Sequence, residues 1–142
     1  MNGFREWLTH PVTVRVCRVA TGLLFAVAAL SKLGDLPAFA EQIHNFRFLP
    51  LFAENAVAMT LPWIELVAAL ALLLNVRPRA GAGVAAGLMA AFTLLVVVSM
   101  FRGLDVECGC FGTADASRVG IVKALQNLGM LALAVVAGLR RR

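Results

Sequence analysis

Four long apolar stretches, each of about twenty residues, alternate along the chain with shorter segments that hold most of its charged side chains. A helix needs about 20 mostly apolar residues to cross a hydrocarbon core that is roughly 30 Å thick. Within lipid the backbone must satisfy its own hydrogen bonds, and apolar runs without alternation favour helices over barrel strands. The pattern predicts a single all-α membrane domain over residues 1–142, a four-transmembrane-helix bundle with spans at about 16–33, 56–76, 80–101 and 119–139.

The first span is the weakest of the four, because Arg18 and Lys32 lie near its two ends. Both side chains are long enough to snorkel to the headgroups, which keeps the span plausible. A cleaved signal peptide is the alternative for this segment. Its parts would be the basic residues Arg5, Arg15 and Arg18, the apolar residues 19–25 and the cleavage motif at 26–28. The long charged stretch favours the membrane span.

The segment between the first two spans, residues 35–52, has a helical pattern of its own. Its apolar residues recur at a spacing of three and four, at Leu36, Phe39, Ala40, Ile43 and Phe46. Asp35 can cap the start of a helix, Pro37 is tolerated in its first turn, and Pro50 should end it. We expect a short amphipathic helix that lies in the membrane interface and roofs the bundle.

Composition excludes two other classes of protein. Hydrophobic residues make up 61% of the chain and charged residues only 15%, against roughly 45–50% and 25% in soluble domains. Disorder requires low hydrophobicity and is excluded as well. The formal charge of +5 does not indicate nucleic-acid binding, because the charges fall between apolar runs and form no basic face on a soluble body. The expected environment is the lipid bilayer.

Basic residues are distributed unequally between the two sides of the predicted bundle. The side with both termini and the 77–79 turn has eight basic residues and one acid, and the other side has four basic residues and six acids. Because Lys and Arg collect on the cytoplasmic side, we expect a multi-pass protein of the inner (cytoplasmic) membrane with both termini cytoplasmic. The longer loops, 34–55 and 102–118, would then face outward.

The outer loop 102–118 contains Cys108-Gly109-Cys110. A bridge between residues two apart closes a very short loop and would add little stability, whereas strained, exposed disulfides tend to be labile and redox-active. The oxidising side of the membrane and the flexible Gly109 favour a redox dithiol. A site for a soft metal such as Cu(I) or Hg(II), and a structural or incidental pair, stay open as alternatives.

Thiolate chemistry requires cations nearby, because the thiolate is the nucleophile. The outer helix ends offer four: Lys32, Arg102, Arg118 and Lys123. Glu107 adjoins Cys108 and disfavours a thiolate there, so we expect the lower thiol pKa at Cys110. Cys17 lies at the other end of the first span, about 30 Å away, and is interpreted as a core or lipid-facing residue.

Glu65 is the tenth residue of its span, and carboxylates inside membranes are costly and usually functional. Gln126 and Asn127 lie at a similar depth in the last span and could form hydrogen bonds to it across the bundle. Glu65 is therefore interpreted either as a polar clasp between helices or as a proton acceptor or quinone contact beneath the dithiol. Pro62, one turn earlier, should kink this helix.

Two stripes of small residues allow close helix approach, at Gly83-x-x-x-Gly87 and at Gly120-x-x-x-Ala124. We expect both to pack within the bundle, and either could instead support a homodimer.

Several segments together resemble a known family. They are FAVAALSK at 25–32, HNFRFLP at 44–50, LPWIEL at 61–66 and CGCFG at 108–112. The chain resembles the MauE branch of the DoxX-like membrane proteins over about residues 15–138. The resemblance implies a four-helix membrane protein that works with a thioredoxin-like periplasmic partner and helps to mature the disulfide-rich small subunit of methylamine dehydrogenase. The client protein and the direction of electron flow do not follow from it.

The sequence thus predicts a membrane thiol–disulfide redox protein, a candidate thiol–disulfide oxidoreductase, with Cys108, Cys110 and Glu65 as its reacting residues. The supporting residues would be Lys32, Arg102, Lys123, Gln126, Asn127 and Pro62. No resident metal is expected. The cofactor is unassigned, although a quinone near Glu65 is the natural acceptor if the protein is an oxidase. A soft-metal handling membrane protein and a non-redox membrane assembly factor are the alternative functions.

Overall fold

The computed structural model describes residues 2–103 and 120–139, and these residues form six helices and no strand. The helices are α1 (Asn2–Thr9), α2 (Pro11–Gly34), α3 (Leu36–Asn45), α4 (Leu51–Leu73), α5 (Pro78–Phe101) and α6 (Ile121–Ala137). Three of them, α2, α4 and α5, are long and apolar enough to cross a membrane, and α6 is a shorter apolar helix of 17 residues. The all-α prediction is confirmed.

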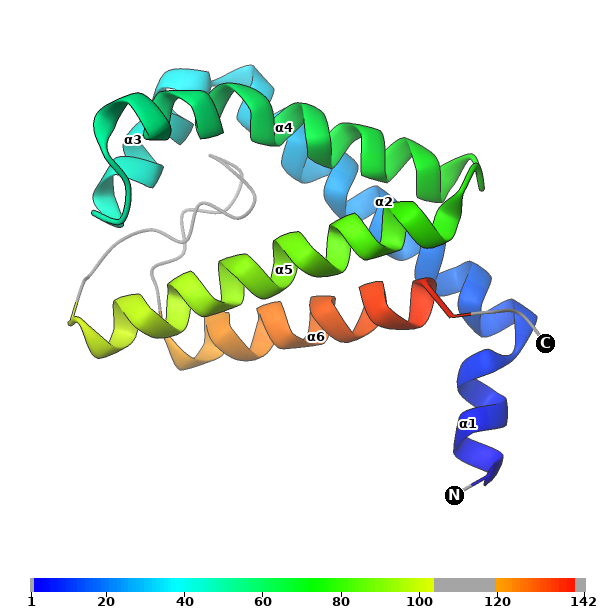
Figure 1. Ribbon diagram of the computed structural model, residues 1–142. Helices are drawn as coiled ribbons and strands as arrows, with labels where there is room; N and C mark the ends of the chain where they lie inside the picture. The colour runs from blue at the N-terminus through cyan, green and yellow to red at the C-terminus, as the bar shows by residue number, and fades with distance from the viewer. Residues whose placement is uncertain (1, 104–119, 140–142) are drawn as a thin grey trace.

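The long helices pack side by side as a bundle (Figure 1). The helix α2 packs on α4 and α6, and α5 packs on the same two helices. The end of α6 and the short helix α1 lie at the end of the bundle where α4 turns into α5, whereas α3 lies at the opposite end (Figure 1). We call these the turn end and the α3 end.

The amphipathic segment folds as predicted at its start and differently at its end. The Asp35 side chain accepts a hydrogen bond from the Ala38 N–H at 3.1 Å, and a proline lies in the first turn. The helix ends at Asn45, before Pro50, because Arg47 adopts a left-handed conformation with φ of 51°. Pro50 instead immediately precedes α4, where its fixed φ suits the entry to a helix.

Each long helix buries one stripe of residues at a spacing of three and four, the period of a helix face. Alanines make up half of the buried residues of the resulting core, and Phe25, Leu72, Met89 and Met130 are its largest members. Cys17 belongs to this core, which confirms its interpretation as a core residue.

Close helix approach occurs at other glycines than the predicted ones. A Cβ added at Gly22 would lie 2.8 Å from Leu73 Cγ, and one at Gly81 would lie 3.1 Å from the Ala68 carbonyl oxygen. At Gly83, Gly87 and Gly120, in contrast, no described atom lies within 4 Å of such a Cβ. The expectation that Gly83 and Gly87 pack within the bundle is therefore wrong, whereas Ala124 of the second stripe packs against Val96 of α5. Gly83 lies half a helical turn from the buried stripe that begins at Gly81.

Arg18 does not extend to the headgroups as the sequence suggested. It is buried at the turn end, where its Nε donates to the Ala137 carbonyl at 2.8 Å and its Nη2 to that of Leu139 at 3.4 Å. Its Nη1 donates to Asn75 Oδ1 at 3.1 Å. The last carbonyls of a helix lack partners within the helix, and its C-terminus favours cations. Arg18 therefore ties α2 to the end of α6.

Candidate functional site

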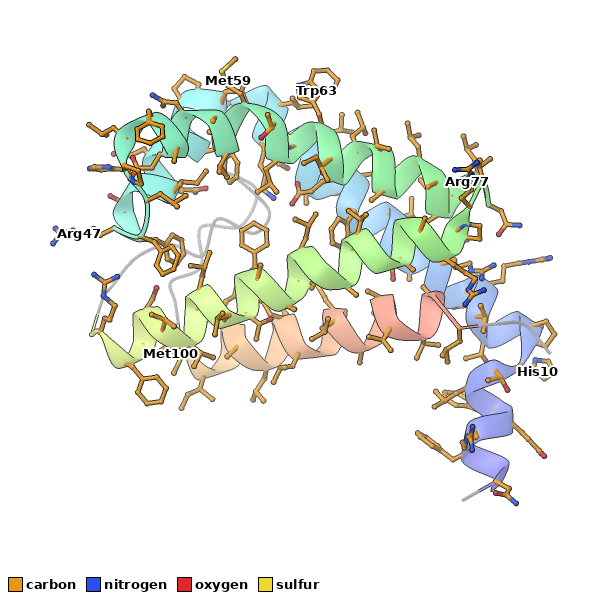
Figure 2. The ribbon with its side chains drawn as sticks, viewed as in Figure 1. His10, Arg47, Met59, Trp63, Arg77 and Met100 are labelled. Atoms are coloured by element: carbon orange, nitrogen blue, oxygen red, sulfur yellow. The ribbon has the colours of Figure 1, made fainter. Side chains whose placement is uncertain are left out.

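A buried ion pair links α2 and α4. The Lys32 Nζ lies 2.7 Å from Glu65 Oε1 and 2.9 Å from Oε2, so it donates to both carboxylate oxygens. The Lys32 side chain is fully buried and that of Glu65 is 1% exposed. Both residues occupy inward positions of largely apolar stripes, whereas Met59 and Trp63 on α4 point outward (Figure 2).

Two aromatic rings enclose the ammonium group. The Lys32 Nζ lies 5.2 Å from the ring centroid of Phe39 on α3 and 5.2 Å from that of Phe92 on α5. A cation this close to a ring face is attracted by the ring quadrupole, and more strongly where water is excluded. Four helices therefore contribute to the surroundings of one charge.

This geometry corrects two expectations. Lys32 does not snorkel to the headgroups, and the hydrogen-bond partner of Glu65 is Lys32 instead of Gln126 or Asn127. The physical reason is that α3 supplies Phe39 against the ammonium, while Glu65 supplies an opposite charge within reach. In a low-dielectric interior a charge–charge hydrogen bond is stronger than one to a neutral amide.

On α6, Lys123 and Asn127 are both buried, one turn apart, and belong to the same inward stripe as Met130. Lys123 Nζ lies 3.3 Å from Gln126 Oε1. The contact between Arg18 of α2 and Ala137 of α6 serves as a reference point for comparing positions along the axes of these two helices. Lys32 follows Arg18 by fourteen residues, and Lys123 precedes Ala137 by fourteen, so each lies about 21 Å from that contact at helical rise. The two buried lysines are therefore at one level, near the α3 end.

Two further polar contacts hold the α3 end together. Arg102 Nη1 donates to the Phe46 carbonyl at 3.3 Å, which joins the end of α5 to the end of α3. His44 Nδ1 lies 2.9 Å from Oε2 of the buried Glu54, which joins α3 to α4. His44 is exposed, and its partner lies ten residues ahead, where no local sequence pattern indicates it.

The remaining predicted site residues have different positions relative to this cluster. Pro62 is buried in α4 one turn from Glu65, and α4 continues through it. Cys108, Cys110 and Arg118 lie outside the described residues, as does Glu107. The segment that contains them runs from Gly103 to Gly120, and the neighbouring Arg102 is tied to the α3 end.

A cavity of about 180 Å³ lies against Phe92, one of the two rings that enclose the Lys32 ammonium, with Phe46, Phe48 and Leu61 among its walls. Its described lining residues are all apolar, so no side chain among them could donate a hydrogen bond to a quinone oxygen. The same part of the chain contains no group of three or more His, Cys, Asp and Glu that could hold a metal ion.

Comparison with known proteins gives one consistent result. Residues 10–140 match the family described as methylamine utilisation protein MauE. The chain is 34% identical to the methylamine utilization protein MauE of Paracoccus denitrificans, over 94% of this chain and 74% of that protein. It is 36% identical to that of Paracoccus versutus, over 94% and 72%, and 31% identical to that of Methylophilus methylotrophus, over 90% and 68%. No solved structure matches this chain.

Proposed function

The chain belongs to the MauE family of methylamine utilisation proteins, and we propose that it is a membrane thiol–disulfide exchange protein. Its redox centre would be the pair Cys108 and Cys110, and its partner a thioredoxin-like periplasmic protein. The client would be an extracytoplasmic protein of the methylamine dehydrogenase small-subunit type. The observation that carries this proposal is the Cys-Gly-Cys motif in the segment that joins α5 to α6.

The exchange step needs both sulfurs. A thiolate of one protein attacks a disulfide sulfur of the other, the attacked S–S bond breaks, and a mixed disulfide forms as the leaving sulfur departs as a thiolate. When the reduced pair attacks a partner disulfide, the second cysteine of the pair attacks the mixed disulfide and releases the reduced partner. When a partner thiolate attacks the oxidised pair, a second thiol of the partner attacks the mixed disulfide and releases the reduced pair. In each direction one disulfide is made and one is broken.

Charges near the ends of the cysteine segment support this chemistry. Arg102 precedes the segment directly, and Lys123 follows it by one turn, buried on the inward face of α6. Cations of this kind stabilise a thiolate. Glu65 keeps its proposed role as a proton acceptor, now within an ion pair with Lys32 that holds its carboxylate in place.

We further propose four membrane spans. The 17 residues of α6 are about 26 Å long at helical rise, and α6 runs beside α5 (Figure 1). With α6 as the fourth span, α3 lies at the outer interface and the turn end, with Arg77 and Arg79, lies in the cytoplasm. This is the arrangement expected for an inner-membrane protein whose two termini are both cytoplasmic.

Orientation can be measured by thiol labelling in a Cys17→Ala background. A membrane-impermeant maleimide applied to intact, reduced cells should label Cys108 or Cys110. In the matched control, Cys108 and Cys110 are changed to Ser and Arg79→Cys supplies a reporter at the turn end, which should be labelled only after lysis. Labelling of the Arg79→Cys reporter in intact cells would reverse the orientation.

The function is tested by the double variant Cys108→Ser/Cys110→Ser. In a strain that lacks its own copy of the protein, this variant should reach the membrane at the normal level yet fail to restore growth on methylamine and the disulfides of the client. Cys17→Ala is the matched control and should restore both, because Cys17 lies in the core far from the proposed chemistry. Full maturation with the double variant would leave a non-redox assembly factor as the function.

A further inference from the structure

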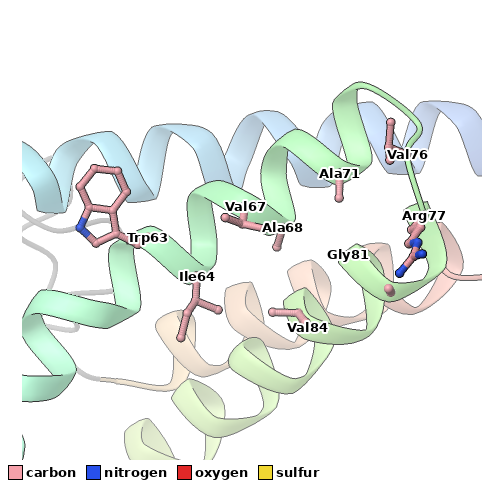
Figure 3. Close-up of a pocket in the computed structure, with 10 residues that line it drawn as sticks. Trp63, Ile64, Val67, Ala68, Ala71, Val76, Arg77, Gly81 and Val84 are labelled. Atoms are coloured by element: carbon pink, nitrogen blue, oxygen red, sulfur yellow. The ribbon is translucent and has the colours of Figure 1, made fainter.

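An apolar groove runs along the outside of the bundle between α4 and α5. Its volume is about 510 Å³, within the range of about 300–1,000 Å³ that is typical of ligand pockets. Figure 3 shows Ile64, Val67 and Ala68 of α4 facing Val84 and Gly81 of α5 across it. The helices can approach at its floor because residue 81 is glycine, where a Cβ would lie 3.0 Å from Ala71 Cβ.

The groove has charge at one end only. Arg77 is the one charged residue among those described as lining it, and it lies at the turn end beside Gly81 (Figure 3). Arg77 adopts a left-handed conformation with φ of 45°, directly before Pro78, a position that disfavours helical backbone. Neither ion pair among the described residues involves Arg77. The positive end of the α5 dipole adds to its charge.

The length of the groove corresponds to one leaflet of a bilayer. Trp63 lines its far end and precedes the last residue of α4, Leu73, by ten positions, which is about 15 Å at helical rise. Half of a hydrocarbon core of roughly 30 Å is also about 15 Å. The groove therefore reaches from the headgroup level at Arg77 to the middle of the membrane.

We propose that this groove binds one anionic glycerophospholipid, with its phosphate at Arg77 and an acyl chain along α4 and α5 towards Trp63. The apolar walls suit a hydrocarbon chain, and the single cation at the membrane edge suits a phosphate. The cytoplasmic leaflet, where the proposed orientation puts Arg77, has the negative surface potential that attracts basic residues. A quinone fits less well, because the described walls of the groove within the membrane are apolar apart from the indole of Trp63 at the far end.

The proposal can be tested with the full chain in nanodiscs made of equal parts phosphatidylglycerol and phosphatidylcholine. The protein is then released into a mild detergent, and the bound lipids are counted by native mass spectrometry. We expect phosphatidylglycerol to be enriched about fivefold over phosphatidylcholine, as one cation at the membrane surface would produce. Arg77→Gln should remove the enrichment and Arg77→Lys should keep it.

Two further variants locate the lipid and serve as controls. Arg47→Gln is the matched control, because Arg47 is also exposed and left-handed but lies at the opposite end of the molecule (Figure 2) and lines no described groove. It should retain the enrichment. Ala80→Phe fills the groove from α5 and should reduce bound lipid of both kinds. Each variant is first checked for normal helix content by circular dichroism.

Three results would overturn the proposal. They are equal binding of the two lipids by the unmodified protein, unchanged enrichment in Arg77→Gln, and unchanged lipid retention in Ala80→Phe. Recovery of a prenylquinone or of a second copy of the chain in place of phospholipid would also contradict it, because each would be a different occupant of the groove.

Discussion

Glu65→Leu is expected to lower the free energy of unfolding by about 3–5 kcal/mol, because it leaves a buried ammonium without its counter-charge. Lys32 is fully buried and has both carboxylate oxygens of Glu65 within 2.9 Å. Glu65→Gln should cost less than Glu65→Leu, since the amide oxygen still accepts one hydrogen bond from Lys32. The measurement is equilibrium unfolding in mixed micelles, followed by far-ultraviolet circular dichroism.

Removing both charges together should restore most of the lost stability. In Lys32→Met/Glu65→Leu no buried charge is left, and the Met thioether can pack against Phe39 and Phe92. Replacing a whole buried ion pair by apolar residues is often neutral or stabilising, so we expect the double variant to be within about 1 kcal/mol of the unmodified protein or above it. Glu41→Gln, at an exposed position of α3, is the control and should change stability by less than about 0.5 kcal/mol.

The same double variant separates structure from function. If Glu65 accepts a proton during disulfide exchange, the double variant should be stable but inactive in client maturation. Full activity would leave the ion pair with a structural role alone. A double variant destabilised by the sum of the effects of Lys32→Met and Glu65→Leu would contradict the pairing itself, because additive effects mean that the two side chains do not interact.

The sequence predicted those features that depend on neighbouring residues. Helical spacing and an Asp35 cap were enough for α3, and the long apolar runs were enough for α2, α4 and α5. The end of α3 was missed because a left-handed turn at Arg47 has no distinct signal in a residue that is not glycine.

The partners of buried charges were not predictable in this way. Arg18 binds the end of α6 across 119 positions, and Lys32 binds Glu65 across 33. A lysine near the end of an apolar span can extend to the headgroups or turn inward, and the choice depends on whether another element covers it. Here Phe39 of α3 lies against the ammonium. The useful sequence signal was that Lys32 continues the inward stripe of Phe25 and Ala28.

The glycine motifs show a similar limit of what a sequence pattern can predict. The repeat of Gly83 and Gly87 satisfies the small-residue motif, yet the helix face that packs is the one with Gly81. A spacing of four identifies a face of a helix but not which way that face points. The partner helix decides the direction, and here Ala68 and Ala71 of α4 meet α5 at Gly81.

Cys108→Ser and Cys110→Ser should each abolish client maturation, but only one of them should accumulate a covalent complex with a thioredoxin-like protein. The partner is released from the mixed disulfide when the second cysteine of the pair attacks it. Loss of that cysteine therefore leaves the covalent complex without an intramolecular route of release. Glu107 adjoins Cys108 and disfavours a thiolate there, which makes Cys110 the expected attacking residue and Cys108→Ser the trapping variant. Non-reducing electrophoresis of membranes from cells quenched with acid would detect the complex, and a reducing agent should dissolve it.

The pattern across the two variants distinguishes the candidate functions. A soft-metal carrier would lose Cu(I) binding in both variants and trap no partner, since both sulfurs would act as ligands. A structural bridge would leave maturation nearly intact, because a disulfide between residues two apart closes so short a loop that its loss costs little. Trapping by Cys110→Ser instead of Cys108→Ser would keep the redox function but exchange the roles of the two cysteines. Trapping by neither variant, together with normal maturation, would exclude the dithiol as the functional centre.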